Sequence, residues 1–367
     1  MDKLLSICIS TYNRAKYLEQ LLNSVFVQFG DVPVEKIELC INDDSADNET
    51  ELVVEKYRKL NKVDLIYQRN HVNTGMERAF LSVVEMSSGK YCWILSDDDL
   101  MIQGALKIIF ETILSNNYDL VIGERNFFVE KYNYQIERQW NFQDNILDNA
   151  TEYNEILNCG FWASTYICSL IFNRDLWFSS KFRDTDISRF RYFIHIRKIF
   201  NALPHSSKST IFLSKPLMAA RGDEFSYTSN SLKVWYYYLV RVLRSLDLYS
   251  EEIIEDCSKR ISKEMGILVE HTYLLKNKIG VNGARYRLNW EIYVKIRKNL
   301  SKKQRLNCLI AIWMPKTIIK SLLLPDCRFD EGFYDLLKRY RLLKMIGYII
   351  LFYIRKSFKL MDKNVGK

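Results

Sequence analysis

The amino-acid sequence predicts an α/β fold, with a mostly parallel sheet that carries helices on both faces and is followed by a helical C-terminal region. Two observations lead to this prediction. Between residues 4 and 114, short apolar runs typical of buried strands alternate with longer segments whose apolar residues recur at helical spacing. From residue 226 onward the pattern is helical. Such alternation favours a parallel sheet, because each helix returns the chain to the side from which the next strand starts.

The strands and helices of the first part are expected to follow one another in order. Strands are predicted at residues 4–9, 37–41, 63–67 and 91–95, and the helices after them from Asn13, over 52–60, over 76–84 and over 106–114. Asn13 is a favourable N-cap residue for the first of these helices. The apolar residues of that helix lie on one stripe, which predicts that one face is buried; they are Leu18, Leu21, Leu22, Val25 and Phe26.

The middle of the chain has a mixed pattern. Residues 165–172 are predicted to form a strand, residues 187–200 a helix, and residues 209–221 one or two short strands. The change to a helical pattern near residue 225 predicts two parts, a domain over residues 1–225 and a helical region over residues 226–367.

Composition and charge exclude several classes of protein. The 367 residues are 48% hydrophobic and 26% charged, which is typical of a globular protein and argues against disorder or a fibrous repeat. The net charge of +9 favours anionic partners. The eight cysteines form no CxxC pair and no zinc or disulfide spacing, so a reducing compartment is expected. No apolar run reaches the roughly 20 residues of a membrane-spanning helix.

Polar and acidic turns follow three of the predicted strands. Ser10–Arg14 follows the first strand, Asn42–Asp47 the second and Ser96–Asp99 the fourth. Because ligands of open α/β sheets bind beyond the carboxyl ends of the strands, these turns are expected to meet at one edge. The three adjacent carboxylates of the last turn would repel one another, and Mg²⁺ or Mn²⁺ would offset that repulsion. A solvated acidic turn beside the dipole of the next helix is the alternative.

Four blocks of sequence occur in an order typical of a known enzyme family. They are SICISTYNR at residues 6–14, ELCINDDSAD at 38–47, NHVNTG at 70–75 and SGKYCWILSDDD at 88–99. With these blocks the first 225 residues resemble glycosyltransferase family 2. Within that family the chain is most similar to the bacterial branch that contains abequosyltransferases of O-antigen assembly, also through GFW at 160–162 and SLIFNRDLW at 169–177. The resemblance implies the GT-A fold, which is Rossmann-like.

The resemblance also implies roles for residues at the three turns. It implies that Thr11, Tyr12 and Arg14 line the nucleotide, that Asp43 or Asp44 contacts the base, that Asp97 holds the ribose, and that Asp98 with Asp99 binds the metal ion. Two departures from the family pattern bear on these roles. The acidic turn after the second strand is one residue shorter than usual, which leaves the choice between Asp43 and Asp44 open, and Ser96 stands where the family often has aspartate.

The general base is the least defined part of the expected site. The resemblance implies an inverting reaction, in which the acceptor hydroxyl displaces the nucleotide and must lose its proton. Family members usually carry a Glu-Asp pair for this task, but the comparable stretch at residues 191–197 has none. His195 is a candidate, because imidazole accepts protons near neutral pH, and a histidine buried between Ile194 and Ile196 is the alternative. Asp184 and Asp186 are the rival bases.

Basic and apolar blocks alternate beyond residue 300. Helices of this composition bind anionic membrane surfaces, so we expect attachment to the inner face of the cell membrane from the cytoplasm. A helical subdomain that packs on the catalytic part is the alternative. No nucleic-acid-binding motif occurs, and nucleic acid is not an expected partner.

These observations together predict a metal-dependent inverting glycosyltransferase. The expected donor is a nucleotide-diphosphate sugar, and the expected acceptor is a hydroxyl of a lipid-linked surface glycan, such as lipopolysaccharide or capsule. Two alternatives remain: a sugar nucleotidyltransferase, which would need a glycine-rich phosphate loop that is absent here, and a non-catalytic membrane-associated scaffold with a degenerate fold.

Overall fold

The computed structural model describes residues 2–129, 134–136, 140, 142–222, 231–270, 274 and 288–313. The strands are β1 (Leu5–Thr11), β2 (Ile37–Asp43), β3 (Asp64–Arg69), β4 (Tyr91–Ser96), β5 (Leu100–Met101), β6 (Leu120–Val129), β7 (Tyr134–Ile136), β8 (Asn145–Asp148), β9 (Leu170–Asn173) and β10 (Ser209–Arg221). The α-helices are α1 (Ala15–Phe26), α2 (Glu49–Arg58), α3 (Met76–Glu85), α4 (Ala105–Ser115), α5 (Asn149–Ser164), α6 (Arg174–Ser179), α7 (Asp184–Arg189), α8 (Ile194–Ala202), α9 (Ser231–Lys233), α10 (Val240–Leu243), α11 (Glu251–Glu264), α13 (Trp290–Ile296) and α14 (Lys302–Trp313). A π-helical segment, η7 (Val234–Leu239), joins α9 to α10.

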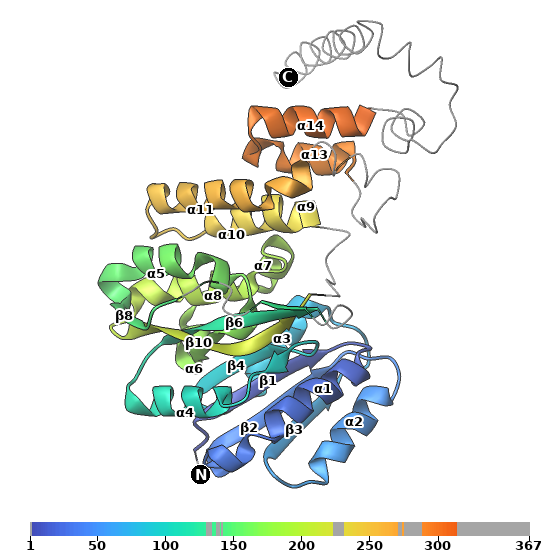
Figure 1. Ribbon diagram of the computed structural model, residues 1–367, viewed down its shortest axis with the longest axis vertical. Coiled ribbons are helices and arrows are strands. Elements are labelled where there is room, and N and C mark those ends of the chain that lie inside the picture. The colour runs from blue at the N-terminus through green and yellow to red at the C-terminus, as the bar shows by residue number, and fades with distance from the viewer. Residues whose placement is uncertain are drawn as a thin grey trace, which may run out of the picture.

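The ten described strands form one mixed sheet in the order β3-β2-β1-β4-β9-β6-β10-β5, with β7 beside β6 and β8 beside β10 (Figure 1). Strands β1 to β4 are parallel, and β9 runs antiparallel to both β4 and β6. Strands β6 and β10 therefore point in the same direction as β4. The predicted mostly parallel sheet is confirmed.

The path of the chain places helices on both faces of the sheet. The connections from β1 to β2 and from β2 to β3 each lead to the next strand toward one edge of the sheet. The connection from β3 to β4 leads back to the other side of β1. Because such crossovers are right-handed, α1 and α2 lie on one face and α3 lies on the other. Figure 1 shows α1 and α2 in front of the sheet. The strand order thus reverses beside β1, where open α/β sheets bind their ligands.

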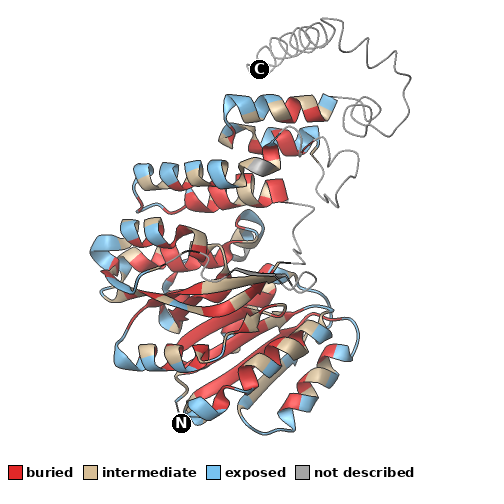
Figure 2. Ribbon diagram, in the orientation of Figure 1, coloured by how far each residue is buried: buried red, intermediate tan, exposed pale blue. Residues whose placement is uncertain are grey.

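The buried core is centred on this sheet, as the red strands of Figure 2 show. Every residue of β2 is buried, and Trp93 in β4 is fully buried and donates its Nε1–H to the carbonyl oxygen of Cys168 at 2.8 Å. Full burial of a large apolar side chain stabilises the fold by about 1.5–3 kcal/mol. The packed strands therefore form a rigid support for the residues at their carboxyl ends.

Several elements differ from the prediction. Asn13 is not the N-cap of the first helix, because α1 follows Arg14 and Asn13 has a φ of +53°; its backbone N–H instead donates to Ser45 Oγ at 2.8 Å. The helix predicted over 187–200 is two helices, α7 and α8, separated at Tyr192 by a φ of +69°.

The strand predictions for the middle of the chain also needed correction. Thr165 is the C-cap residue of α5, and the strand predicted from that residue starts only at Leu170, after a short 3₁₀ turn over Ile167–Ser169. Residues 209–221 form one long strand, which shifts register against β6 around Pro216.

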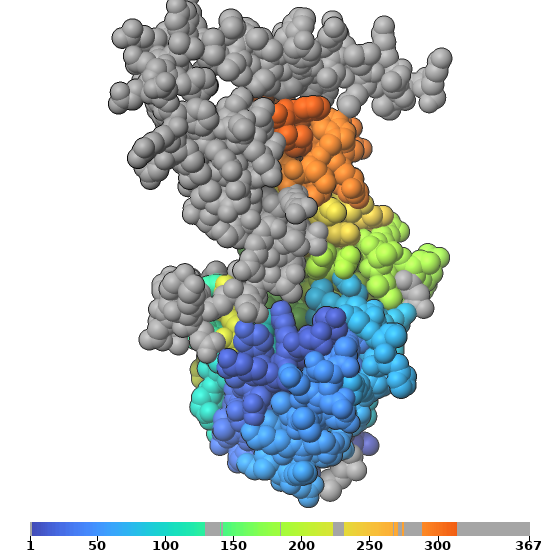
Figure 3. All heavy atoms as spheres, turned by 90° about the vertical axis from the view of Figure 1, so that its right-hand side faces the viewer, coloured from blue at the N-terminus to red at the C-terminus, as the bar shows by residue number. Residues whose placement is uncertain are grey.

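The chain after residue 231 is helical where it is described, as predicted. In Figure 1, α10, α11, α13 and α14 follow one another away from the sheet along the long axis of the molecule, and Figure 3 shows the same succession from the side. Within the described ranges, no helix combines the length and the apolar character that crossing a bilayer requires. The domain boundary predicted near residue 225 and the basic, apolar segment beyond residue 313 lie outside the described residues.

Candidate active site

The ends of β1, β2 and β4 bring the three polar turns together. Ser10 of β1 is paired with Asn42 of β2 on one side and with Ser96 of β4 on the other. Thr11 is paired with Asp43. The predicted convergence of the three turns on one edge of the sheet is therefore confirmed.

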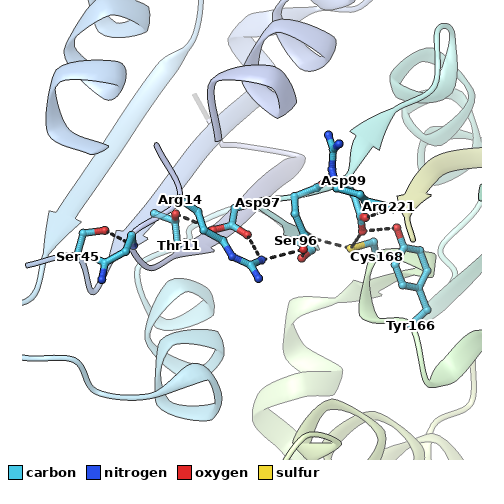
Figure 4. A network of polar contacts seen from close by, with 11 residues as sticks. Thr11, Arg14, Ser45, Ser96, Asp97, Asp99, Tyr166, Cys168 and Arg221 are labelled. Carbon is cyan, nitrogen blue, oxygen red and sulfur yellow. Dashed lines mark hydrogen bonds and ion pairs between the residues drawn. The ribbon is translucent and has the colours of Figure 1, made fainter. Parts of the chain in front are cut away.

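Arg14 lies between Asp97 and Asp98 of the last turn, and Figure 4 shows its side chain beside Asp97. Its Nη1 is 3.2 Å from Asp97 Oδ1 and 2.8 Å from Asp98 Oδ2. Thr11 Oγ1 donates to Asp97 Oδ2 at 2.7 Å. Burial lowers the pKa of Arg14, but the two carboxylates outweigh this effect and the pKa is raised. The guanidinium of Arg14 thus places a positive charge between the two carboxylates, which would otherwise repel one another.

The carboxylate of Asp97 is held in a buried, polar position. Burial raises its pKa to about 6, the charge of Arg14 opposes this shift, and the neighbouring Asp98 adds to it. Ser96 Oγ donates to Asp98 Oδ1. Asp98 is more open than Asp97, with 13% of its side chain exposed against 6%. Of the two, Asp98 is better placed to meet a ligand.

The buried side chain of Asp99 points toward Tyr166 and Cys168 (Figure 4). Its Oδ2 accepts from the hydroxyl of Tyr166 at 2.5 Å and from the thiol of Cys168 at 3.6 Å, and its Oδ1 accepts from the backbone N–H of Arg221 at 2.8 Å. Burial, followed by the charge of Asp98, raises its pKa to about 7. The metal-binding role implied for Asp99 stays a prediction, and in this structure both of its oxygens already accept hydrogen bonds.

Arg221 is a site residue that the sequence did not single out. It ends β10, and its Nε donates to the carbonyl oxygen of Asp98 at 2.8 Å, while Nη2 donates to Gln20 Oε1 at 2.7 Å. Its guanidinium also lies over the rings of Tyr17 and Phe128, at 4.8 and 4.7 Å from their centroids. Since β10 runs parallel to β4, its carboxyl end also lies at the edge where open α/β sheets bind ligands. This is the signal that could have identified Arg221.

The two acidic residues at the end of β2 have different surroundings. Asp43 accepts from Tyr67 Oη at 2.9 Å and from the backbone N–H of Ser45 at 2.8 Å. Asp44 accepts from Asn70 Nδ2 at 2.7 Å and from the backbone N–H groups of Thr74 and Gly75 at 3.0 and 3.2 Å.

Asp44 therefore fastens the loop before α3 to the end of β2, and Asp43 has fewer protein partners. Tyr12, at the end of the neighbouring strand, is 48% exposed.

The candidate bases lie in or beside α7 and α8. His195 is 2% exposed, and its Nε2–H donates to the carbonyl oxygen of Ser164 at 2.9 Å, which leaves Nδ1 buried with no partner among the described residues. Burial lowers its pKa to about 4. These surroundings match the alternative of a core histidine.

Asp186 is half-buried and lines a cavity of about 570 Å³, and its Oδ2 accepts from the backbone N–H of Arg183 at 3.0 Å. Asp184 is the first residue of α7, and its side chain lies outside what the structure describes. Which of these residues is the base stays a prediction.

The chemistry of the donors at the acidic turn fits a divalent oxygen-binding cation. Among the described residues no three histidine, cysteine, aspartate or glutamate side chains are grouped as a complete metal site. Mg²⁺ and Mn²⁺ need only one or two carboxylates when phosphate oxygens complete their shell. Asp98, with its partly open carboxylate, is the residue that would hold such an ion.

Comparison with known proteins identifies the family. The model of the family described as "Glycosyl transferase family 2" matches residues 6–172. The abequosyltransferase RfbV of Salmonella typhimurium is 31% identical over 271 residues, which cover 68% of this chain and 77% of that protein. The chain belongs to glycosyltransferase family 2. It is accordingly a glycosyltransferase.

A second glycosyltransferase, TarS, matches this chain in part of its sequence and in its fold. The poly(ribitol-phosphate) β-N-acetylglucosaminyltransferase TarS of Staphylococcus aureus is 30% identical over 118 residues, which cover 32% of this chain and 20% of that protein. The crystal structure of S. aureus TarS 1–349 in complex with UDP superposes with a TM-score of 0.53 at 18% identity, over 89% of this glycosyltransferase and 94% of that chain. A longer TarS structure gives a TM-score of 0.56 at 18% identity, and the match spans 84% of this chain but only 52% of the TarS chain. The predicted GT-A fold is confirmed.

Proposed function

We propose that this glycosyltransferase moves a sugar, with inversion, from a nucleotide-diphosphate sugar to a hydroxyl group of a lipid-linked surface glycan, and that it depends on Mg²⁺ or Mn²⁺. The observation that carries the proposal is the arrangement of Thr11, Arg14, Asp97 and Asp98 at the carboxyl edge of the sheet, where the strand order reverses. This position is the usual ligand site of such sheets. The relative RfbV is named an abequosyltransferase and the TarS structure was solved with UDP, which supports a nucleotide-activated donor.

Each residue at the edge has a proposed part in holding the donor. Asp43 accepts a hydrogen bond from the base, since its carboxylate has fewer protein partners than that of Asp44. The exposed ring of Tyr12 lies against the nucleoside, and Asp97 holds the ribose while Thr11 and Arg14 fix its orientation. Asp44 has an indirect role, because it positions the loop at Thr74 and Gly75 and does not itself contact the donor.

The departure of the nucleoside diphosphate requires positive charge at the acidic turn. Asp98 would hold the divalent cation, which supplies Lewis-acid stabilisation of the diphosphate when it is bound. Arg14 and Arg221 add two positive charges near the same turn, and Arg221 holds the backbone of Asp98 in place. Because the guanidinium of Arg14 is 2.8 Å from Asp98, it must move or share that carboxylate when the cation is bound.

The acceptor hydroxyl must lose a proton as it attacks the sugar. Asp186 and His195 differ in how they meet this need: Asp186 lines a cavity open to solvent, whereas His195 is buried and its pKa is lowered to about 4. We infer that Asp186 is the better placed of the two. A general base contributes about 10²–10⁴-fold to the rate, so the two substitutions separate the alternatives.

Release of nucleoside diphosphate tests the proposal directly. The purified chain is incubated with UDP-, GDP-, CDP- and dTDP-sugars, with Mn²⁺ or EDTA, and with lipid-linked glycan acceptors from bacterial membranes. We expect release from one of these donors in Mn²⁺ alone, and a loss of at least about 100-fold in Asp98→Asn. Asp31→Asn is the matched control, because Asp31 is exposed and distant in the chain from the acidic turn. Equal activity of both variants would refute the role of Asp98.

Two further measurements test the finer parts. The anomeric configuration of the product, read by NMR, must be opposite to that of the donor if the reaction is inverting. Asp186→Asn is expected to lower the rate about 10²–10⁴-fold, while His195→Gln keeps most of it. Activity that survives in Asp186→Asn and disappears in a folded His195→Gln would assign the base to the histidine. Formation of nucleotide sugar from sugar phosphate and nucleoside triphosphate would instead favour a nucleotidyltransferase.

A further inference from the structure

A cavity outside the acidic turn is lined largely by cationic side chains. It has a volume of about 570 Å³ and lies between α7, α8 and the turn after α10. In Figure 1, α7 and α8 lie between the sheet and the C-terminal helices α11, α13 and α14. Five lining residues are cationic, two are anionic and three are uncharged: Lys181, Arg183, Arg189, Arg197 and Arg244, then Asp186 and Asp247, then Phe182, Phe190 and Ser245.

The positive charges of this cavity are not neutralised by the two carboxylates. Among the described residues, neither Asp186 nor Asp247 comes within ion-pair distance of a cationic nitrogen of the cavity, although both act on Arg197 through their charge. Asp186 instead accepts a hydrogen bond from the backbone of Arg183. The cavity therefore carries a surplus of positive charge, which like-charge repulsion makes unfavourable unless an anion enters.

Two of the arginines are held as a pair by one aromatic ring. The guanidinium carbons of Arg189 and Arg197 lie 5.1 and 5.5 Å from the centroid of the buried ring of Phe190. The Nη1 of Arg197 is buried and has no hydrogen-bond partner in the described part of the chain. Burial also lowers the pKa of this guanidinium, against the charges of Asp247 and Asp186. A buried N–H donor without a partner is costly, so an acceptor oxygen that reached this group would relieve that cost.

We propose that this cavity binds a phosphate-bearing anion, separately from the donor nucleotide at the acidic turn. Arginine guanidinium groups present their N–H donors in a fork that matches two phosphate oxygens, and five cations around one cavity suit a diphosphate or a phosphodiester better than a single carboxylate. The same chemistry is offered by a soluble phosphate compound and by the headgroup of an anionic lipid. The proposal is argued from the charges of this cavity, which also contains Asp186, the base proposed above.

Binding of inorganic pyrophosphate to the full chain, measured by calorimetry in EDTA, tests the first source. The double variant Arg189→Gln/Arg197→Gln is expected to bind at least about tenfold more weakly than wild type. The control Arg58→Gln/Lys107→Gln removes the same charge from exposed positions on α2 and α4 and is expected to bind like wild type. Because Arg189 and Arg197 line the cavity and do not belong to the acidic turn, their effect on pyrophosphate binding separates this cavity from the proposed donor site.

Sedimentation with phosphatidylglycerol vesicles, with phosphatidylcholine vesicles as reference, tests the second source. A loss of phosphatidylglycerol binding in the double variant and not in its control supports a lipid headgroup, and a loss of pyrophosphate binding alone supports a soluble ligand. If the double variant does not fold, Arg244→Gln decides, since Arg244 is exposed and lines the same cavity. The proposal is overturned if wild type, the cavity variants and the control bind both probes equally. It is also overturned if wild type binds neither probe.

Discussion

Replacing Arg14 by methionine tests whether the acidic turn needs a cation to be stable. The guanidinium is 3.2 Å from Asp97 and 2.8 Å from Asp98, and the three side chains are 24%, 6% and 13% exposed. Removal of one partner from a fully buried ion pair costs about 3–5 kcal/mol, because the remaining charge is left unpaired. Since Arg14 keeps part of its exposure, we expect the free energy of unfolding of Arg14→Met to fall by about 2–3 kcal/mol at pH 8.

Urea denaturation with and without MnCl₂ measures this loss. A ligand at 100 times its dissociation constant adds about 2.7 kcal/mol to the stability of the state that binds it. We expect Mn²⁺ to stabilise Arg14→Met more than wild type, because in wild type the ion competes with the guanidinium for Asp98. Lys56→Met is the control: its amino group is 2.6 Å from Glu19, but the side chains are 61% and 37% exposed, and such surface pairs contribute about 0–1 kcal/mol.

Two results would refute this reasoning. If Arg14→Met loses no more stability than Lys56→Met, the two carboxylates tolerate one another without the guanidinium. If Mn²⁺ stabilises wild type and Arg14→Met equally, the ion does not bind where Arg14 lies.

Three further predictions concern the same edge of the sheet. In EDTA, the contribution of Asp97 and Asp99 to the free energy of unfolding should fall as the pH rises from about 4 to about 7, because burial raises the folded-state pKa of Asp97 to about 6 and that of Asp99 to about 7, so the folded protein binds more protons there; urea denaturation of wild type and Asp99→Asn at stepped pH should give profiles of different slope, and equal slopes would contradict the raised pKa of Asp99. Tyr166→Phe removes a donor to buried Asp99 and should cost about 1–3 kcal/mol in urea denaturation, whereas a neutral effect would mean that the bond contributes nothing. Gly75→Ala places a side chain at a φ of +87° and should cost about 1 kcal/mol or more while weakening nucleotide binding in calorimetry, and wild-type stability would show that the loop relaxes.

Much of the fold was predictable because its elements are local. The stripe of Leu18, Leu21 and Leu22 in α1 and the buried run of β2 are read from neighbouring residues, and parallel pairing then places Asp43 and Asp98 at one edge. Within residues 4–115 the predicted helices and strands were confirmed, with ends that differ by a few residues.

The partners of the acidic turn were not predictable in the same way. Tyr166 and Arg221 form hydrogen bonds with Asp99 because β9 and β10 lie on the same side of β4 in the sheet. This strand order depends on the tertiary fold and not on neighbouring residues. The helix predicted over 187–200 failed for a different reason, since neither glycine nor asparagine marks the positive φ of Tyr192. The sequence does not decide whether His195 is buried, because its apolar neighbours are equally compatible with a base beside a pocket and with a core histidine.

The bond between the end of β10 and the acidic turn affects how the enzyme is made. Domains begin to fold during synthesis, from the N-terminus onward. β1, β2 and β4 can pair before residue 209 has left the ribosome, but Asp98 and Asp99 then lack the hydrogen bonds that Arg221 supplies. A nascent chain, or a fragment that stops at residue 172 where the family match ends, would contain every acidic residue of the turn and still lack the arginine that holds its backbone.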